Sequence, residues 1–288
     1  MGAGGARAFT LVEMIVVVSI VSVLMAILVP AANLVRRQAR AFLGMYNQRE
    51  ISNALNLFAM DNNDRYPQSI ATVGTSDTWS WSDPTKMIGI EQRSPQLHRS
   101  MSAYLHDYIS DAKTMFCPNA PQRYKYLQEA WDAGDDWDNP DTPRRTDPLG
   151  GTYCFYWNYV GYLSESQTLF RGPTGPASMG RYNQLLVTDY FGYDHWRSPG
   201  AFGSCERLKG AEIVEETQLL SSYWAVEGDP ELAMPDVKLR AVYTDGHVET
   251  YSASDVMPMK ISKTPEGVPP YPDGSAGGTF FVPETILP

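Results

Sequence analysis

An apolar run from Phe9 to Val35 is the feature of this chain that most constrains its fold. Glu13 is the single charged side chain within its 27 positions, and Arg7 is the single one in the eight positions before it. An α-helix needs roughly 20 apolar residues to cross a bilayer, so the run predicts a membrane-spanning helix. The apolar region of a secretory signal peptide is only about 7–15 residues long, so this longer run indicates a helix that the mature protein keeps.

Glu13 places a charge where a simple anchor needs none. A charged side chain within a membrane helix costs about 2.5–3.5 kcal/mol on insertion scales, so it indicates a function and a partner for the carboxylate. The alternative is an ordinary signal anchor, in which Glu13 lies a turn inside Phe9 and reaches the lipid headgroups.

Residues 9–13 read F-T-L-V-E, and Pro30 follows twenty-one residues after Phe9. This pattern resembles the N-terminus of type IV pilins and type II secretion pseudopilins. In that family a short leader is cut before a Phe or Met, the new N-terminal amine is methylated, and a Glu lies four residues further on. The resemblance implies cleavage between Ala8 and Phe9, methylation of Phe9, and roles in assembly for Glu13 and Pro30. Ala8 stands where the family usually has Gly.

The same resemblance implies a structural subunit, with no catalysis of its own, of a type IV pilus or a type II secretion-like filament. Its partners would be a prepilin peptidase/methyltransferase, further copies of itself, other pilins or pseudopilins, and an inner-membrane assembly platform. After cleavage, the α-amino group of Phe9 has a reference pKa of about 7.7–8.0 and stays largely cationic at neutral pH. It could pair with Glu13 of a neighbouring subunit, which would offset the burial of both charges and set the register between subunits.

Basic residues around the apolar run bear on its orientation. Arg7 stands alone before the run, whereas Arg36, Arg37 and Arg40 follow it. The positive-inside rule alone would therefore place the C-terminus in the cytoplasm. The family resemblance implies the opposite: a single-pass protein of the bacterial inner membrane with its head outside the cytoplasm, later part of a filament in the periplasm or at the cell surface.

Helical spacing continues beyond Pro30, which should bend the helix because an interior proline removes one backbone hydrogen bond. The turn formers and proline of D-N-N-D-R-Y-P at residues 61–67 end it. We therefore predict a leader (1–8), a transmembrane and filament-core helix (9–35), its amphipathic continuation (36–63) and an exported globular head (64–288). The expected fold is α+β and pilin-like, with the long helix packed against a small antiparallel sheet and with long irregular loops.

Strand signals are clearest near the C-terminus. Residues 237–243 alternate in polarity, and Asp245-Gly246 separates them from a second such run, which predicts a hairpin with a type I′ turn. Residues 184–190 read as another strand. The string T-D-G-H-V-E also resembles the C-terminal hairpin of large pilin-like proteins of planctomycete and verrucomicrobial bacteria. Many of those have a His ten residues before the Asp, where this chain has Pro235.

Charge is distributed unevenly along the chain. Residues 1–50 hold five Arg and two Glu, a net charge of +3, and the total is −10, so the remaining residues carry −13. An acidic head argues against nucleic acid or anionic lipid as the partner of the head. It suits an exported, soluble domain.

Three cysteines, Cys117, Cys154 and Cys205, leave at least one thiol unpaired. Export would permit one disulfide. The F-C-P element around Cys117 is similar to that of the same pilin-like group, and this resemblance favours a bond between Cys117 and Cys154. Three buried thiols are the alternative.

Catalytic and cofactor motifs are absent from the sequence: the four histidines lack metal-ligand spacing, and no Walker, G-x-S-x-G or dinucleotide fingerprint occurs. We therefore expect no enzyme activity and no cofactor other than a structural Ca²⁺. Asp136 and Asp138, in the acidic stretch 129–147, are candidate ligands, with a solvated acidic loop as the alternative. By resemblance to major pseudopilins, which hold calcium near the end of the head, Asp245 and Asp255 are further candidates.

Trp131 and Trp137 in the same acidic stretch could form a platform for a sugar. This leaves an alternative function, a filament-displayed or membrane-anchored module that binds a glycan or protein. A third reading is an anchored enzyme or solute-binding protein whose N-terminus only imitates a prepilin.

Overall fold

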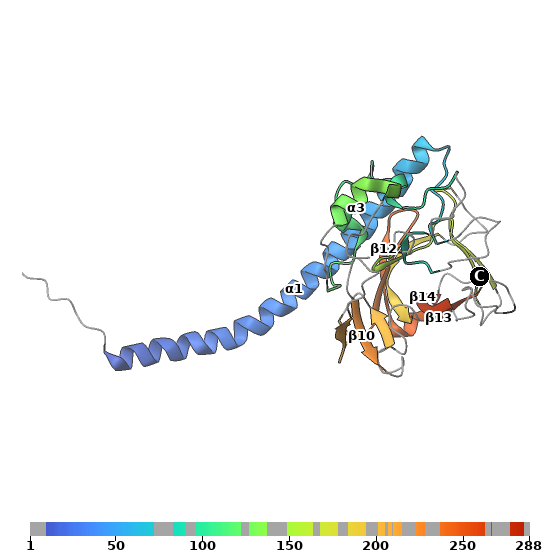
Figure 1. The fold of residues 1–288 in the computed structure, drawn as a ribbon. Coiled ribbons are helices and arrows are strands. Elements are labelled where there is room, and N and C mark those ends of the chain that lie inside the picture. Colours follow the sequence, from blue (N-terminus) through green and yellow to red (C-terminus); the bar gives the residue numbers. More distant parts are fainter. Residues whose placement is uncertain are drawn as a thin grey trace, which may run out of the picture. The chain divides into compact units, whose positions relative to one another are not determined.

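The computed structural model describes residues 10–71, 83–89, 96–121, 127–136, 149–163, 168–177, 184–193, 201–204, 207–208, 210–214, 223–227, 237–262, 266 and 277–284. The chain divides into two compact units, Met1–Phe42 and Leu43–Pro288. The helix α1 (Leu11–Asp61) runs through both (Figure 1).

Helix α1 confirms the predicted long N-terminal helix, which was expected to run from Phe9 to about Asn62. It is helical on both sides of Pro30, which lies inside it, and the predicted bend there stays a prediction. The helix ends where the turn formers begin. Asn63 and Asp64 take positive φ angles of 56° and 57°, and the N–H of Asp64 donates to the Ala59 carbonyl at 2.8 Å. Asn and Asp tolerate this left-handed conformation better than most residues, which is why they terminate the helix here.

All strand pairs among the described residues are antiparallel, in three sheets. The four-stranded sheet has the order β12 (Val248–Ser252), β11 (Lys238–Tyr243), β6 (Leu185–Asp189), β3 (Tyr153–Phe155). The eight-stranded sheet has the order β5 (Thr168–Arg171), β4 (Val160–Leu163), β13 (Val256–Ser262), β14 (Gly277–Pro283), β7 (Phe191–Tyr193), β8 (Ala201–Ser204), β10 (Tyr223–Glu227), β9 (Glu212–Val214). Strands β1 (Lys86–Ile88) and β2 (Leu149–Gly150) form a separate pair.

The strands predicted over 184–190 and 237–251 are confirmed as β6, β11 and β12. Long irregular loops were expected in the head, but the stretch between Pro67 and Gln184 holds strands β1 to β5 and several short helices. These helices are α2 (Ser102–Leu105), α3 (Leu127–Ala133) and the 3₁₀ turns η1 (Ala112–Met115) and η2 (Gly134–Asp136); a further 3₁₀ turn, η4 (Ala253–Asp255), follows β12. These strands are too short, and too often buried on both faces, to show alternation in the sequence.

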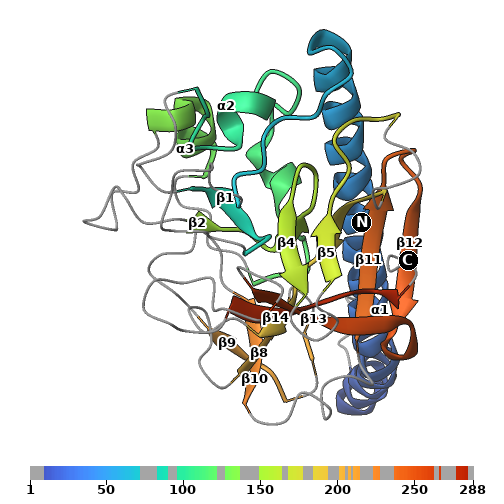
Figure 2. The ribbon, with the colours of Figure 1, turned by 90° about the vertical axis from the view of Figure 1, so that its right-hand side faces the viewer.

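The four-stranded sheet is the middle layer of the second unit, because each of its faces is covered by a separate apolar core. On one face, Val242 and Leu186 pack with Ile51 and Leu55 of α1. On the other, Leu239 packs with residues of β13 and β14. Figure 2 shows α1, in blue, passing behind β11 and β12, with β13 and β14 on the near side. The order of layers is thus helix, four-stranded sheet, eight-stranded sheet.

The buried face of α1 gives a direct test of this packing. Leu55 is fully buried, whereas Leu57 is 50% exposed on the same helix. We expect Leu55→Ala to lower the free energy of unfolding of the head by about 2–5 kcal/mol, because it removes buried methyl groups and leaves a cavity. Leu57→Ala is the matched control and should change it by less than about 0.5 kcal/mol. Urea unfolding of the detergent-solubilised full chain, followed by tryptophan fluorescence, measures both; equal losses would contradict the assigned face.

Candidate functional site

The described part of α1 begins with a capping box. The Thr10 hydroxyl accepts a hydrogen bond from the Glu13 N–H at 3.2 Å, and one Glu13 carboxylate oxygen accepts from the Thr10 N–H and hydroxyl, each at 2.8 Å. This reciprocal arrangement satisfies backbone donors that the first turn of a helix leaves without partners. The pattern T-x-x-E is the sequence signal of a capping box, and sequence reasoning about Glu13 as an intersubunit ligand overlooked it. Ala8 and Phe9 lie outside the described residues.

Side chains along the apolar part of α1 are exposed within this single chain. Its two serines are satisfied inside the helix, since Ser19 donates to the Ile15 carbonyl at 2.6 Å and Ser22 to the Val18 carbonyl at 2.7 Å. By length and composition the helix is able to cross a membrane, and in the part of the chain that the structure describes it is the one helix that qualifies. Glu13 is the one ionisable group in the segment from Leu11 to Val35.

Beyond Gly44, α1 is joined to the four-stranded sheet by a buried polar cluster. Arg240 of β11 and Asp189 of β6 form an ion pair at 2.8 Å, with side chains only 4% and 2% exposed. The Gln48 amide of α1 donates to the other Asp189 carboxylate oxygen at 2.9 Å and to the Arg240 carbonyl at 3.3 Å. Buried charges require such hydrogen-bonded pairing. The cluster therefore ties the helix to two strands at one register.

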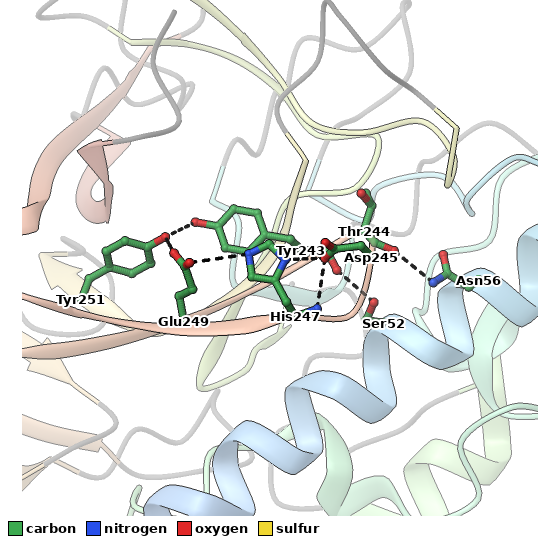
Figure 3. Close-up of polar contacts among 8 residues, drawn as sticks. All are labelled: Ser52, Asn56, Tyr243, Thr244, Asp245, His247, Glu249 and Tyr251. Carbon is green, nitrogen blue, oxygen red and sulfur yellow. Dashed lines mark hydrogen bonds and ion pairs between the residues drawn. The ribbon is translucent and has the colours of Figure 1, made fainter.

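A second group of contacts joins α1 to the tip of the β11–β12 hairpin (Figure 3). The Ser52 hydroxyl donates to the Tyr243 carbonyl at 3.1 Å, and the Asn56 amide donates to the Thr244 carbonyl at 3.1 Å. Since the two helix residues are one turn apart, they bind successive carbonyls where the strand leaves the sheet. The hairpin tip is thus held by side chains of the helix.

The hairpin turn differs from the predicted type I′. The Gly246 N–H donates to the Tyr243 carbonyl at 2.9 Å, and only Gly246 among the loop residues has a positive φ, of 81°. A type I′ turn needs positive φ at both central residues, so this is a three-residue connection in which glycine supplies the left-handed position. Asp245 instead uses its side chain, which accepts from the His247 N–H at 3.0 Å.

Asp245 and Asp255, two of the candidate calcium ligands, have local partners. Burial raises the pKa of the Asp245 carboxyl, but hydrogen bonds from the His247 N–H and ring outweigh it and hold that pKa below its usual value. The His247 ring also stacks on Tyr243, with ring centres 4.4 Å apart. Asp255 accepts from the Ser252 hydroxyl at 2.5 Å and from the Ser252 N–H at 3.3 Å, and these bonds lower its pKa.

Asp136 lies in η2, and Asp138 falls outside the described residues. Among the residues that the structure describes, no three His, Cys, Asp or Glu side chains come together as metal ligands. The Ca²⁺ site therefore stays a prediction.

The structure does not bring together Cys117 and Cys154, the pair for which a disulfide was expected. Both residues are buried. Cys154 alternates with Tyr153 and Phe155 along β3, so it points to the core on the far side of the sheet, whereas Cys117 belongs to the core on the helix side. The middle sheet thus separates the two sulfur atoms. Cys205 lies outside the described residues.

One of the two tryptophans suggested as a platform for sugar binding, Trp131, is buried. Trp131 is 1% exposed, and its indole N–H donates to the Ile109 carbonyl at 2.8 Å inside the helix-side core. Trp137 lies outside the described residues. Trp131 is therefore a core residue and cannot form an exposed platform with Trp137, and the glycan-binding alternative stays a prediction.

Comparison with known families identifies a motif in the N-terminal part of the chain. Residues 5–29 match the prokaryotic N-terminal methylation motif, which supports a type IV pilin- or pseudopilin-like prepilin. The matched segment contains the capping box, Glu13 and most of the exposed apolar helix, and it is typical of proteins processed by a prepilin peptidase. Comparisons with curated proteins and with solved structures give no match.

The buried cluster predicts a large effect for removing one charge. Arg240→Met should destabilise the head by about 3–5 kcal/mol, because it removes the buried positive charge that pairs with Asp189. The double variant Arg240→Met/Asp189→Leu should recover much of that loss, since both buried charges are then gone. Urea unfolding of the full chain measures both variants. A double variant as unstable as the single one would contradict the assigned origin of the effect.

The capping of η4 predicts a pH response at Asp255. Its folded pKa is lowered, so its stabilising contribution is present above the unfolded value, about 3.9, and is lost as the pH falls through the folded pKa. Carbon-13 NMR titration of the Asp255 carboxyl in the full chain should give a pKa below 3.9, and Ser252→Ala should move it upward. An unchanged value in the variant would show that Ser252 is not the cause.

Proposed function

We propose that this chain is a structural subunit of a type IV pilus or a type II secretion-like filament, with no catalysis of its own. A prepilin peptidase would remove residues 1–8 and methylate Phe9, and the subunit would assemble with other pilins or pseudopilins through α1. The observation that carries the proposal is a lone carboxylate, Glu13, in the first turn of an exposed apolar helix within the methylation motif. The head would lie outside the cytoplasm.

Glu13 suits pairing with the amine of a neighbouring subunit. The capping box uses one of its carboxylate oxygens, Oε2, for both Thr10 donors, and none of the hydrogen bonds found among the described residues involves Oε1. A cationic α-amino group could therefore bind the second oxygen without breaking the cap. Opposite charges in a low-dielectric surrounding attract strongly, and the pairing offsets the cost of burying both.

The second part of α1 also exposes apolar side chains that suit packing between subunits. Leu43, Tyr46, Leu57 and Met60 are 50–75% exposed and lie on the side of the helix opposite the buried Leu55. They form two pairs of neighbours, Leu43 with Tyr46 and Leu57 with Met60, and the polar residues Glu50 and Asn53 lie between the pairs. In the proposed filament these side chains and the apolar first part of α1 would contact neighbouring helices.

Two conservative variants separate the charge of Glu13 from its capping role. Glu13→Gln keeps a capping box, because Gln serves at that position, but removes the charge. Thr10→Val removes the cap and keeps the charge. We expect Glu13→Gln to reduce cross-linking between copies in the native membrane at least tenfold, and Thr10→Val to reduce it much less.

N-terminal mass spectrometry of the same samples tests processing. The wild-type chain should begin at N-methyl-Phe9. A chain that still begins at Met1 or Gly2 would overturn the proposal of a processed subunit. If the wild type and Glu13→Gln are cleaved normally and assemble equally, only the proposed role of the Glu13 carboxylate would be overturned.

A further inference from the structure

Three arginines follow directly on the apolar part of α1. Arg36, Arg37 and Arg40 are all exposed, and no acidic residue occurs in the sequence between Glu13 and Glu50. Residues four apart are neighbours on a helix, so Arg36 and Arg40 share one face, and Arg37 lies about 100° around the axis from Arg36. These three residues, here named the arginine belt, form a compact cationic surface.

The position of the belt along the helix matches the depth of lipid headgroups. From Leu11 to Val35, about 25 residues at 1.5 Å per residue span about 38 Å. A bilayer has a hydrocarbon core of about 30 Å and a thickness of about 40–45 Å with its headgroups. A helix that places the apolar segment in the core therefore brings the belt to the headgroup layer.

Nothing within the described residues of the chain neutralises the belt. None of the ion pairs and side-chain hydrogen bonds found there involves Arg36, Arg37 or Arg40. The belt also lies on the head side of the apolar segment, where basic residues oppose the usual orientation bias of a protein with an exported head. Orientation therefore does not account for its place in the sequence.

We propose that the arginine belt binds the phosphate groups of anionic phospholipids on the head side of the membrane. This rests on the membrane-spanning role of α1 in the proposed function. A guanidinium group is always charged and presents a planar fork of donors that matches phosphate oxygens. The belt would hold the subunit at a defined depth before assembly and counteract repulsion between the anionic surface and the head, whose net charge is −13 when residues 1–50 are excluded.

Lipid is favoured over the acidic head of a second copy because the belt directly continues the apolar segment. Every inserted subunit therefore meets headgroups at this position, with or without a neighbour. The acidic head of a second copy is the competing polyanion.

Native mass spectrometry of the detergent-solubilised full chain tests the proposal, with phosphatidylglycerol and phosphatidylcholine as lipid probes. The triple variant Arg36→Gln/Arg37→Gln/Arg40→Gln should lose phosphatidylglycerol adducts at least tenfold relative to wild type, with phosphatidylcholine adducts unchanged. The control Arg49→Gln removes one exposed arginine of α1 outside the belt and should keep them. Soluble glycerol phosphate, added in excess, tests whether a free phosphate group can replace the lipid. The phosphatidylglycerol adducts should persist, because the belt binds the headgroup of a whole lipid.

Equal phosphatidylglycerol binding by wild type and triple variant, or equal binding of the two lipids by wild type, would overturn the proposal. Unchanged lipid binding with loss of cross-linking between copies would overturn it in favour of the second copy. Extraction of membranes with alkaline carbonate separates this failure from failure of the proposed function. If carbonate releases the wild type from the membrane, the membrane-spanning role fails and the belt proposal fails with it. If the wild type and the triple variant both stay in the membrane but bind phosphatidylglycerol equally, only the belt proposal fails.

Discussion

The buried ion pair between Arg240 and Asp189 is the interaction on which the arrangement of the head depends. It joins β11 to β6, and Gln48 ties both strands to α1. Two charges out of water are costly unless their hydrogen-bonding groups are satisfied, so a shift of the helix by one residue would break the cluster. Apolar packing around Leu55 tolerates small displacements far better, because it is not directional. The polar cluster thus selects one register among those that the apolar core alone would accept.

The two ends of α1 meet different physical requirements. Near Glu13 an apolar helix must carry a carboxylate, and Thr10 satisfies one of its oxygens locally. Near Ser52 and Asn56 the helix must hold a strand end, and short polar side chains bind the hairpin carbonyls. In both places a polar side chain lies where an apolar one would have continued the apolar stripe of the helix. These positions mark where the helix does more than bury surface.

Elements with strong local signals were predictable. The long helix, its end at Asp61 and the hairpin around Asp245-Gly246 follow from periodicity and turn chemistry, which act over a few neighbouring residues. The exact turn was missed because Asp245-Gly246 also suits a three-residue connection, in which only Gly246 takes the left-handed conformation. Most of the eight-stranded sheet was missed because its strands are short and pair across long sequence separations.

By itself, the sequence determined the apolar helix, the place of Glu13 in its first turn, the methylation motif and the acidic charge of the head, because each depends only on residues close together in the chain. Tertiary structure alone decided that Trp131 is a core residue and that Cys117 and Cys154 lie in different cores. It alone brought Gln48, Asp189 and Arg240 together. Burial and pairing of this kind depend on which strands, far apart in the sequence, lie side by side, and the local sequence pattern does not determine this.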